Sequence, residues 1–153
     1  MINDENLTSR RQLDRRLSPF KPTARFDPPS RGWIRAVRDA LGMSGAQLGR
    51  RMDVTAQSVS DIEKSEAAGT IQLKTLRRVA EAMDCVLIYA LVPRSSLEEI
   101  VQERARELAE RALSGVAHTM RLESQGLSDR DHQDLIDDYI RTNIRRRDLW
   151  END

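Results

Sequence analysis

Residues 44–66 of the 153-residue chain read SGAQLGRRMDVTAQSVSDIEKSE. Two short segments in it each begin with a helix-capping residue: Ser44, with a glutamine three positions later, and Thr55. Asp53 stands between the two segments, where an aspartate readily adopts left-handed backbone. Gly49 stands where the two helices must approach most closely. These features predict two short helices joined by a tight turn, which is a helix-turn-helix.

The apolar side chains of this stretch are expected to face the core. They are Ala46, Leu48, Met52, Val54, Val59 and Ile62. The opposite face of the second helix is then free to enter the major groove of DNA and read base edges. The predicted base-reading residues are Ala56, Gln57, Ser60 and Asp61. The amide of Gln57 suits bidentate pairing with adenine.

Two acidic residues of the second helix have alternative interpretations. Asp61 either accepts a hydrogen bond from cytosine N4 or pairs with a neighbouring arginine, and the second is favoured because a free carboxylate beside phosphate is costly. Glu63 is expected to pair with an arginine of a neighbouring helix rather than to read DNA. Other polar residues around the motif are expected to contact DNA phosphates, which gives register and salt-dependent affinity. They are Ser44, Thr55, Ser58, Lys64, Arg50, Arg51 and Lys74.

Outward from this motif, hydrophobic spacing predicts an all-α fold in three parts. Residues 1–31 form a basic N-terminal helix followed by a proline-containing arm, in which Arg10, Arg11, Arg15 and Arg16 either enter the minor groove or line a solvated face. Residues 32–93 form the helix-turn-helix domain, and residues 94–153 form a C-terminal helical extension.

Residues 85–92 read CVLIYALV, a continuous apolar run that predicts one short β-strand. A lone strand leaves its backbone donors and acceptors unpaired, so it needs a partner. The expected partner is the same strand of a second copy, which predicts a homodimer; residues 20–27 are the alternative. The residues expected to form this interface are Val86, Ile88, Tyr89 and Leu91.

Composition narrows the class of protein. Residues 1–31 carry seven basic and four acidic side chains, whereas residues 93–153 carry ten and fourteen, so the two ends suit different partners. The single cysteine excludes a disulfide framework. No apolar run is long enough to span a membrane, and an arginine-rich start does not suit export, so a cytoplasmic protein is expected. No catalytic, cofactor or metal-ligand spacing occurs, so we expect no enzyme, no cofactor and no metal.

The segments Ala-Gln-Leu, Val-Thr, Gln-Ser-Val-Ser and Ile-Glu-Lys within residues 44–66 resemble the repressor-type helix-turn-helix family, the Cro/C1 or XRE class. The run Arg-Arg-Gln-Leu-Asp-Arg-Arg-Leu at residues 10–17, with Gly-Trp-Ile-Arg at 32–35 and Ala-Leu-Gly-Met-Ser at 40–44, is similar to the mobile mystery protein A family. Members of that family are encoded beside a Fic-domain protein. The resemblance implies an antitoxin that binds its own double-stranded DNA operator and a Fic-domain toxin.

One short motif bears on that partner. Antitoxins of Fic enzymes often inhibit through Ser/Thr-x-x-x-Glu-Gly/Asn, and Thr119 with Glu123 nearly matches it, with Ser in the last place. An ordinary helix end is the alternative interpretation. If the resemblance to the Fic-linked family does not hold, the chain is a stand-alone transcriptional regulator whose C-terminal helices dimerise or sense a ligand.

Overall fold

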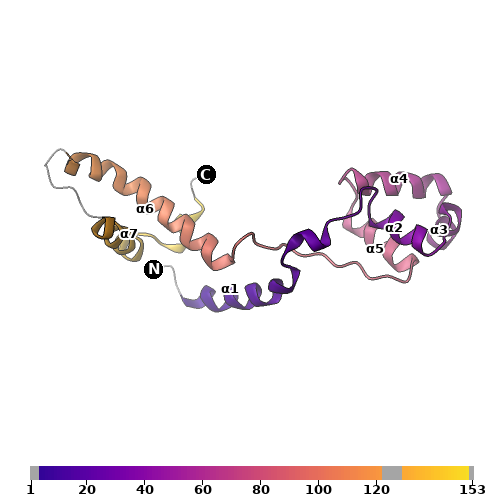
Figure 1. The fold of residues 1–153 in the computed structure, drawn as a ribbon, viewed down its shortest axis with the longest axis horizontal. Helices are drawn as coiled ribbons and strands as arrows, with labels where there is room; N and C mark the ends of the chain where they lie inside the picture. Colours follow the sequence, from indigo (N-terminus) through magenta and orange to yellow (C-terminus); the bar gives the residue numbers. More distant parts are fainter. Residues whose placement is uncertain (1–3, 122–128, 152–153) are drawn as a thin grey trace. The chain divides into compact units, whose positions relative to one another are not determined.

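The computed structural model describes residues 4–121 and 129–151 (Figure 1). This part of the chain contains seven α-helices and three short 3₁₀ turns, and it confirms the all-α fold class. The helices are α1 (Asp4–Leu17), α2 (Trp33–Ala40), α3 (Gly45–Met52), α4 (Ala56–Ala67), α5 (Leu73–Ala82), α6 (Leu97–Arg121) and α7 (Asp129–Asn143). The 3₁₀ turns are η1 (Ser18–Phe20), η2 (Thr23–Phe26) and η3 (Arg146–Leu149).

The chain divides into two compact units, and one of them is discontinuous in sequence. The first, here the helix-turn-helix unit, is Phe20–Leu91 and holds α2 to α5. The second, here the terminal unit, combines Met1–Pro19 with Val92–Asp153. The predicted N-terminal helix therefore packs with the C-terminal helices, although sequence alone placed it with the proline arm.

The core of the helix-turn-helix unit forms where the apolar faces of its four helices meet. Its buried side chains are Ile34, Leu48, Met52, Val59, Val79 and Met83. Val54 and Ile62 pack against them, so most of the predicted inward positions are confirmed. Ala46 is the exception, because it lies exposed on α3.

In the terminal unit, α6 packs against both α1 and α7. The carboxylate of Asp14 on α1 accepts a hydrogen bond of 2.9 Å from the backbone N–H of Leu97, the first residue of α6. The Nε atom of Arg10 lies 2.6 Å from an oxygen of Glu98. Arg10 thus contacts α6 within its own unit, whereas the sequence offered it either a DNA groove or solvent.

The prediction of a β-strand at residues 85–92 is wrong for the single chain. Residues 86–94 have no regular secondary structure and make no backbone hydrogen bond within the described part of the chain. A strand is defined by its ladder of hydrogen bonds, and the residues that the structure describes supply no partner for one. Residues 20–27, the alternative partner, form 3₁₀ turns instead. The four side chains predicted to form the interface, Val86, Ile88, Tyr89 and Leu91, are left exposed, with Val86 at 85% and Leu91 at 89%.

Within the described ranges, no helix is both long enough and apolar enough to cross a membrane.

Candidate nucleic-acid interface

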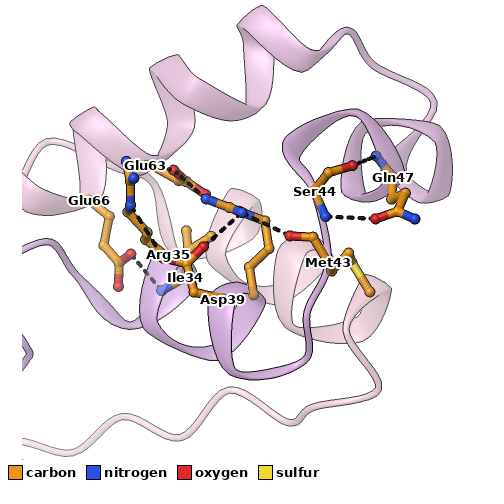
Figure 2. Close-up of polar contacts among 9 residues, drawn as sticks. Ile34, Arg35, Asp39, Met43, Ser44, Gln47, Glu63 and Glu66 are labelled. Carbon is orange, nitrogen blue, oxygen red and sulfur yellow. Dashed lines mark hydrogen bonds and ion pairs between the residues drawn. The ribbon is translucent and has the colours of Figure 1, made fainter.

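The turn between α3 and α4 has the local geometry that the sequence predicts. Ser44 and Gln47 form a reciprocal capping box at the start of α3, with hydrogen bonds of 3.1 Å and 2.7 Å (Figure 2). Asp53 ends α3 in the left-handed conformation, at φ 57°. A Cβ atom on Gly49 would lie 2.6 Å from the carbonyl oxygen of Val54. Only glycine therefore allows the turn to fold this closely against α3.

The start of α4 is held by its cap. The hydroxyl of Thr55 accepts a 3.0 Å hydrogen bond from the backbone N–H of Ser58, and the two hydroxyl groups lie 2.9 Å apart. Both hydroxyl groups are thereby fixed beside the N-terminus of α4, whose free N–H groups and dipole favour an anion. Ser44 has the same place at the start of α3.

The predicted base-reading residues share one face of α4. Ala56, Gln57 and Asp61 are exposed, and Ser60 is half-buried. The Nε2 group of Gln57 donates a 3.0 Å hydrogen bond to Asp61 Oδ1, and the ammonium group of Lys64 lies 4.0 Å from the same oxygen. Asp61 is thus paired with Gln57 and Lys64, not with an arginine as expected.

The contact with Asp61 holds the amide of Gln57 in one orientation. It uses one of the two hydrogens on Nε2 and leaves the other hydrogen and the Oε1 acceptor free. One donor and one acceptor are what bidentate pairing with adenine requires. The geometry is therefore compatible with the reading role predicted for this glutamine.

A buried ion pair connects α4 to α2. Arg38 donates from Nε and Nη2 to the two carboxylate oxygens of Glu63, at 2.6 Å and 3.3 Å, and from Nη1 to the carbonyl of Met43 at 2.8 Å. Both side chains are buried. Hydrogen bonding to Glu63 raises the pKa of Arg38, against the opposing effect of burial. The prediction that Glu63 is structural is confirmed.

A second carboxylate performs a capping role that the sequence did not reveal. The two oxygens of Glu66 accept hydrogen bonds of 2.9 Å from the backbone N–H groups of Trp33 and Ile34, at the start of α2. Figure 2 shows the contact with Ile34. Gly32 at the N-cap has no side chain to do this, and a Cβ atom there would lie 2.5 Å from Glu66. The sequence does show that α2 begins after a glycine and so lacks a capping side chain of its own. It does not show that the cap comes from Glu66, which lies 32 residues from Ile34.

The predicted phosphate-contacting residues differ in their availability. Arg50, Lys64 and Lys74 are exposed. Arg51 is exposed as well, but it also donates a 2.7 Å hydrogen bond to the carbonyl of Ala82 and so connects α3 to the end of α5. Their roles toward DNA stay predictions.

Two further predicted sites lie at or beyond the limits of the described structure. Thr119 falls within α6, but its side chain is not among the described ones, and Glu123 lies outside the described residues.

Among the residues that are described, no group of three or more His, Cys, Asp or Glu side chains is placed to hold a metal ion.

Comparison with curated proteins and with solved structures gives no match. A family model does match, and it covers almost all of α2 together with α3, α4 and α5. Residues 34–87 match the model described as helix-turn-helix, so this part of the chain is similar to helix-turn-helix domains.

Proposed function

We propose that the protein is a transcriptional regulator that reads its operator with the exposed face of α4. The helix-turn-helix domain supports sequence-specific DNA binding. The observation that carries the proposal is the reading helix itself: its first turn is capped by Thr55, its buried side is bound to α2 through Glu63, and its outer side presents Gln57 in a fixed orientation. A side chain that is already oriented loses less conformational entropy on binding.

Gln57→Ala is expected to weaken binding to the cognate operator by about 1–3 kcal/mol, because the variant loses a bidentate base contact. Binding to unrelated DNA is expected to stay the same, since the phosphate contacts remain. Fluorescence anisotropy with the promoter fragment of the protein's own gene and with a scrambled fragment measures both affinities.

Gln133→Ala is the matched control, because Gln133 also donates to an aspartate four residues later, Asp137, but lies on α7 of the terminal unit. It is expected to bind the operator like the wild type. Equal operator affinities for wild type and Gln57→Ala would refute the assigned role of Gln57. No binding of the wild type to any promoter fragment would refute the proposed function.

We also propose that the regulator acts as a homodimer joined through residues 85–92. A helix-turn-helix protein binds two half-sites about 34 Å apart through a two-fold pair of subunits. The exposed apolar run has unpaired backbone groups, and a second copy of itself would satisfy them.

Ile88→Asp is expected to convert a dimer into a monomer of 17.5 kDa, because it places a charge in the apolar interface. Sedimentation equilibrium measures the mass. The control is Thr70→Asp, which places the same charge at an exposed position of the same unit outside the proposed interface. This variant is expected to remain dimeric. A monomeric wild type at micromolar concentration, or a dimeric Ile88→Asp variant, would exclude this interface.

We further propose that this regulator is the antitoxin and autoregulator of a toxin–antitoxin module with a Fic-domain partner. It rests on the sequence resemblance, and the acidic C-terminal segment offers a partner surface distinct from the DNA-reading helix. A Fic-domain protein encoded next to this gene is expected to co-purify with the full chain after co-expression. Failure to co-purify would favour a stand-alone regulator.

A further inference from the structure

A small cleft in the helix-turn-helix unit gathers cationic side chains beside the reading helix. Its volume is about 170 Å³, and it lies between the segment that precedes α2, α2 itself and the second half of α4. Arg31, Arg35 and Lys64 line it, with hydroxyl groups from Ser30 and Ser60. The sequence reasoning assigned no role to either arginine.

The one carboxylate in the lining is already neutralised. Glu63 receives two hydrogen bonds from the buried Arg38, whereas Arg35 Nη1 approaches it only to 4.0 Å. Figure 2 shows Arg35 beside Glu63 and Asp39. The charge of Glu63 therefore does not cancel that of the three lining cations, although it keeps Arg35 close to the cleft.

The lining cations themselves are weakly engaged. Arg35 Nε lies 3.5 Å from Asp39, and Lys64 lies 4.0 Å from Asp61, both in ion pairs with more than half of the carboxylate side chain exposed. Exposed pairs of this kind contribute little free energy and exchange readily for a better anion. Arg31 is exposed and makes no hydrogen bond or ion pair within the described residues.

We propose that this cleft binds a phosphate group. Two arginines supply the planar forks that match phosphate oxygens, Lys64 adds a point charge, and the serines add hydroxyl donors. Its position indicates the source: the cleft includes Ser60, one of the predicted base-reading residues on the outer face of α4, and Lys64, which pairs with another of them, Asp61. A duplex lying on that face brings its backbone past the cleft, so the phosphate is a DNA phosphodiester. This part of the inference rests on the proposed function.

The experiment measures the salt dependence of operator binding by the full-length protein. Each phosphate contact adds about 0.9 to the slope of log affinity against log salt concentration. Arg31→Ala and Arg35→Ala each remove one cation from the cleft and are expected to lower that slope by up to about 0.9, so that the loss of affinity from 50 mM to 200 mM salt becomes up to about 3–4-fold smaller. Operator and scrambled DNA are expected to weaken equally, because a phosphate contact reads no base.

Arg130→Ala is the charge-matched control, because Arg130 is an exposed arginine on α7 of the terminal unit. It is expected to keep the wild-type slope. The side chain of Arg31 makes no hydrogen bond or ion pair within the described residues, so its variant keeps the test valid even if a change at Arg35 disturbs α2. Wild-type slopes in both the Arg31 and the Arg35 variants would overturn the DNA phosphate assignment.

A second measurement separates DNA from a free phosphate. Inorganic phosphate is titrated into the DNA-free protein, and the NMR signals of the Arg31 and Arg35 Nε–H groups are followed, with sulfate and chloride as controls. Saturable binding below 1 mM phosphate, with unchanged salt slopes in the variants, assigns the cleft to a free phosphorylated ligand. If the variants keep the wild-type salt slope and the protein does not bind phosphate, the proposal is overturned altogether. Failure of the wild type to bind DNA refutes the proposed function but leaves the phosphate titration decisive for the cleft.

Discussion

Replacing Glu63 with alanine is expected to lower the free energy of unfolding of the helix-turn-helix unit by about 3–5 kcal/mol. The variant removes the carboxylate that accepts two hydrogen bonds of the buried Arg38, whose remaining charged partner is the half-exposed carboxylate of Asp39, 2.9 Å from Nη1. Removing one partner of a buried pair costs more than the pair contributes, because the remaining charge stays desolvated. Urea unfolding followed by NMR signals of α3 and α4 measures the loss in this unit, since the two units need not unfold together.

Two further variants distinguish this cause from a general loss of packing. Glu81→Ala removes an exposed carboxylate from α5 and is expected to change stability by less than about 0.5 kcal/mol. The double variant Arg38→Met with Glu63→Met replaces both charges with apolar side chains and is expected to recover most of the loss. A Glu63→Ala protein as stable as the wild type would show that Arg38 reaches water when its partner is absent.

The effect is also expected to be independent of pH from neutral to moderately alkaline solution. The pKa of Arg38 is raised in the folded protein, chiefly by its hydrogen bond to Glu63. A raised pKa stabilises the fold at every pH below the pKa of the unfolded arginine, and the contribution is lost only as the pH rises through the folded value. For arginine both values are strongly alkaline.

Gly49→Ala is expected to destabilise the helix-turn-helix unit by about 3 kcal/mol, at the upper end of the range for overpacking. The new Cβ would lie 2.6 Å from the carbonyl oxygen of Val54 and 3.2 Å from the carbonyl carbon of Thr55. Both atoms belong to the backbone of the turn, so no flexible side chain is available to move aside. The turn must open, and the cap of α4 at Thr55 moves with it.

The same substitution four residues earlier supplies the control. A Cβ atom on Gly45 has its nearest contact, with Val59, at 4.0 Å, and Gly45 begins α3 without a positive φ. Gly45→Ala is therefore expected to be neutral or to stabilise the unit by up to about 1 kcal/mol through helix propensity. Urea midpoints for both variants, with operator affinity as a second measurement, test the difference. Similar midpoints for the two variants would contradict the close approach at Gly49.

The features that sequence predicted correctly are local ones. The capping box at Ser44, the left-handed turn at Asp53 and the cap at Thr55 each depend on residues within three or four positions, so their geometry follows from residue type. The buried faces of α3 and α4 follow from helical periodicity in the same way, apart from Ala46. An alanine carries too little apolar surface to indicate which side of a helix faces the core.

The features that sequence did not predict depend on distant partners. Arg38 meets Glu63 across 25 positions, and Arg10 meets Glu98 across 88. In a chain with 25 basic and 25 acidic residues, too many pairings of this kind are available for spacing to select one. The error at residues 85–92 has a related cause, because an apolar β-branched run indicates a strand while its pairing is set by whatever lies beside it.

The arrangement of α1 with α6 means that the helix-turn-helix unit sits within the sequence of the other unit, attached at both its ends. A protease that cuts one of these two connections leaves the helix-turn-helix unit attached to the terminal unit through the other connection. Expression of the C-terminal helices alone would also leave Leu97 without the carboxylate of Asp14, so a fragment intended to isolate α6 and α7 needs residues 4–17 supplied as well.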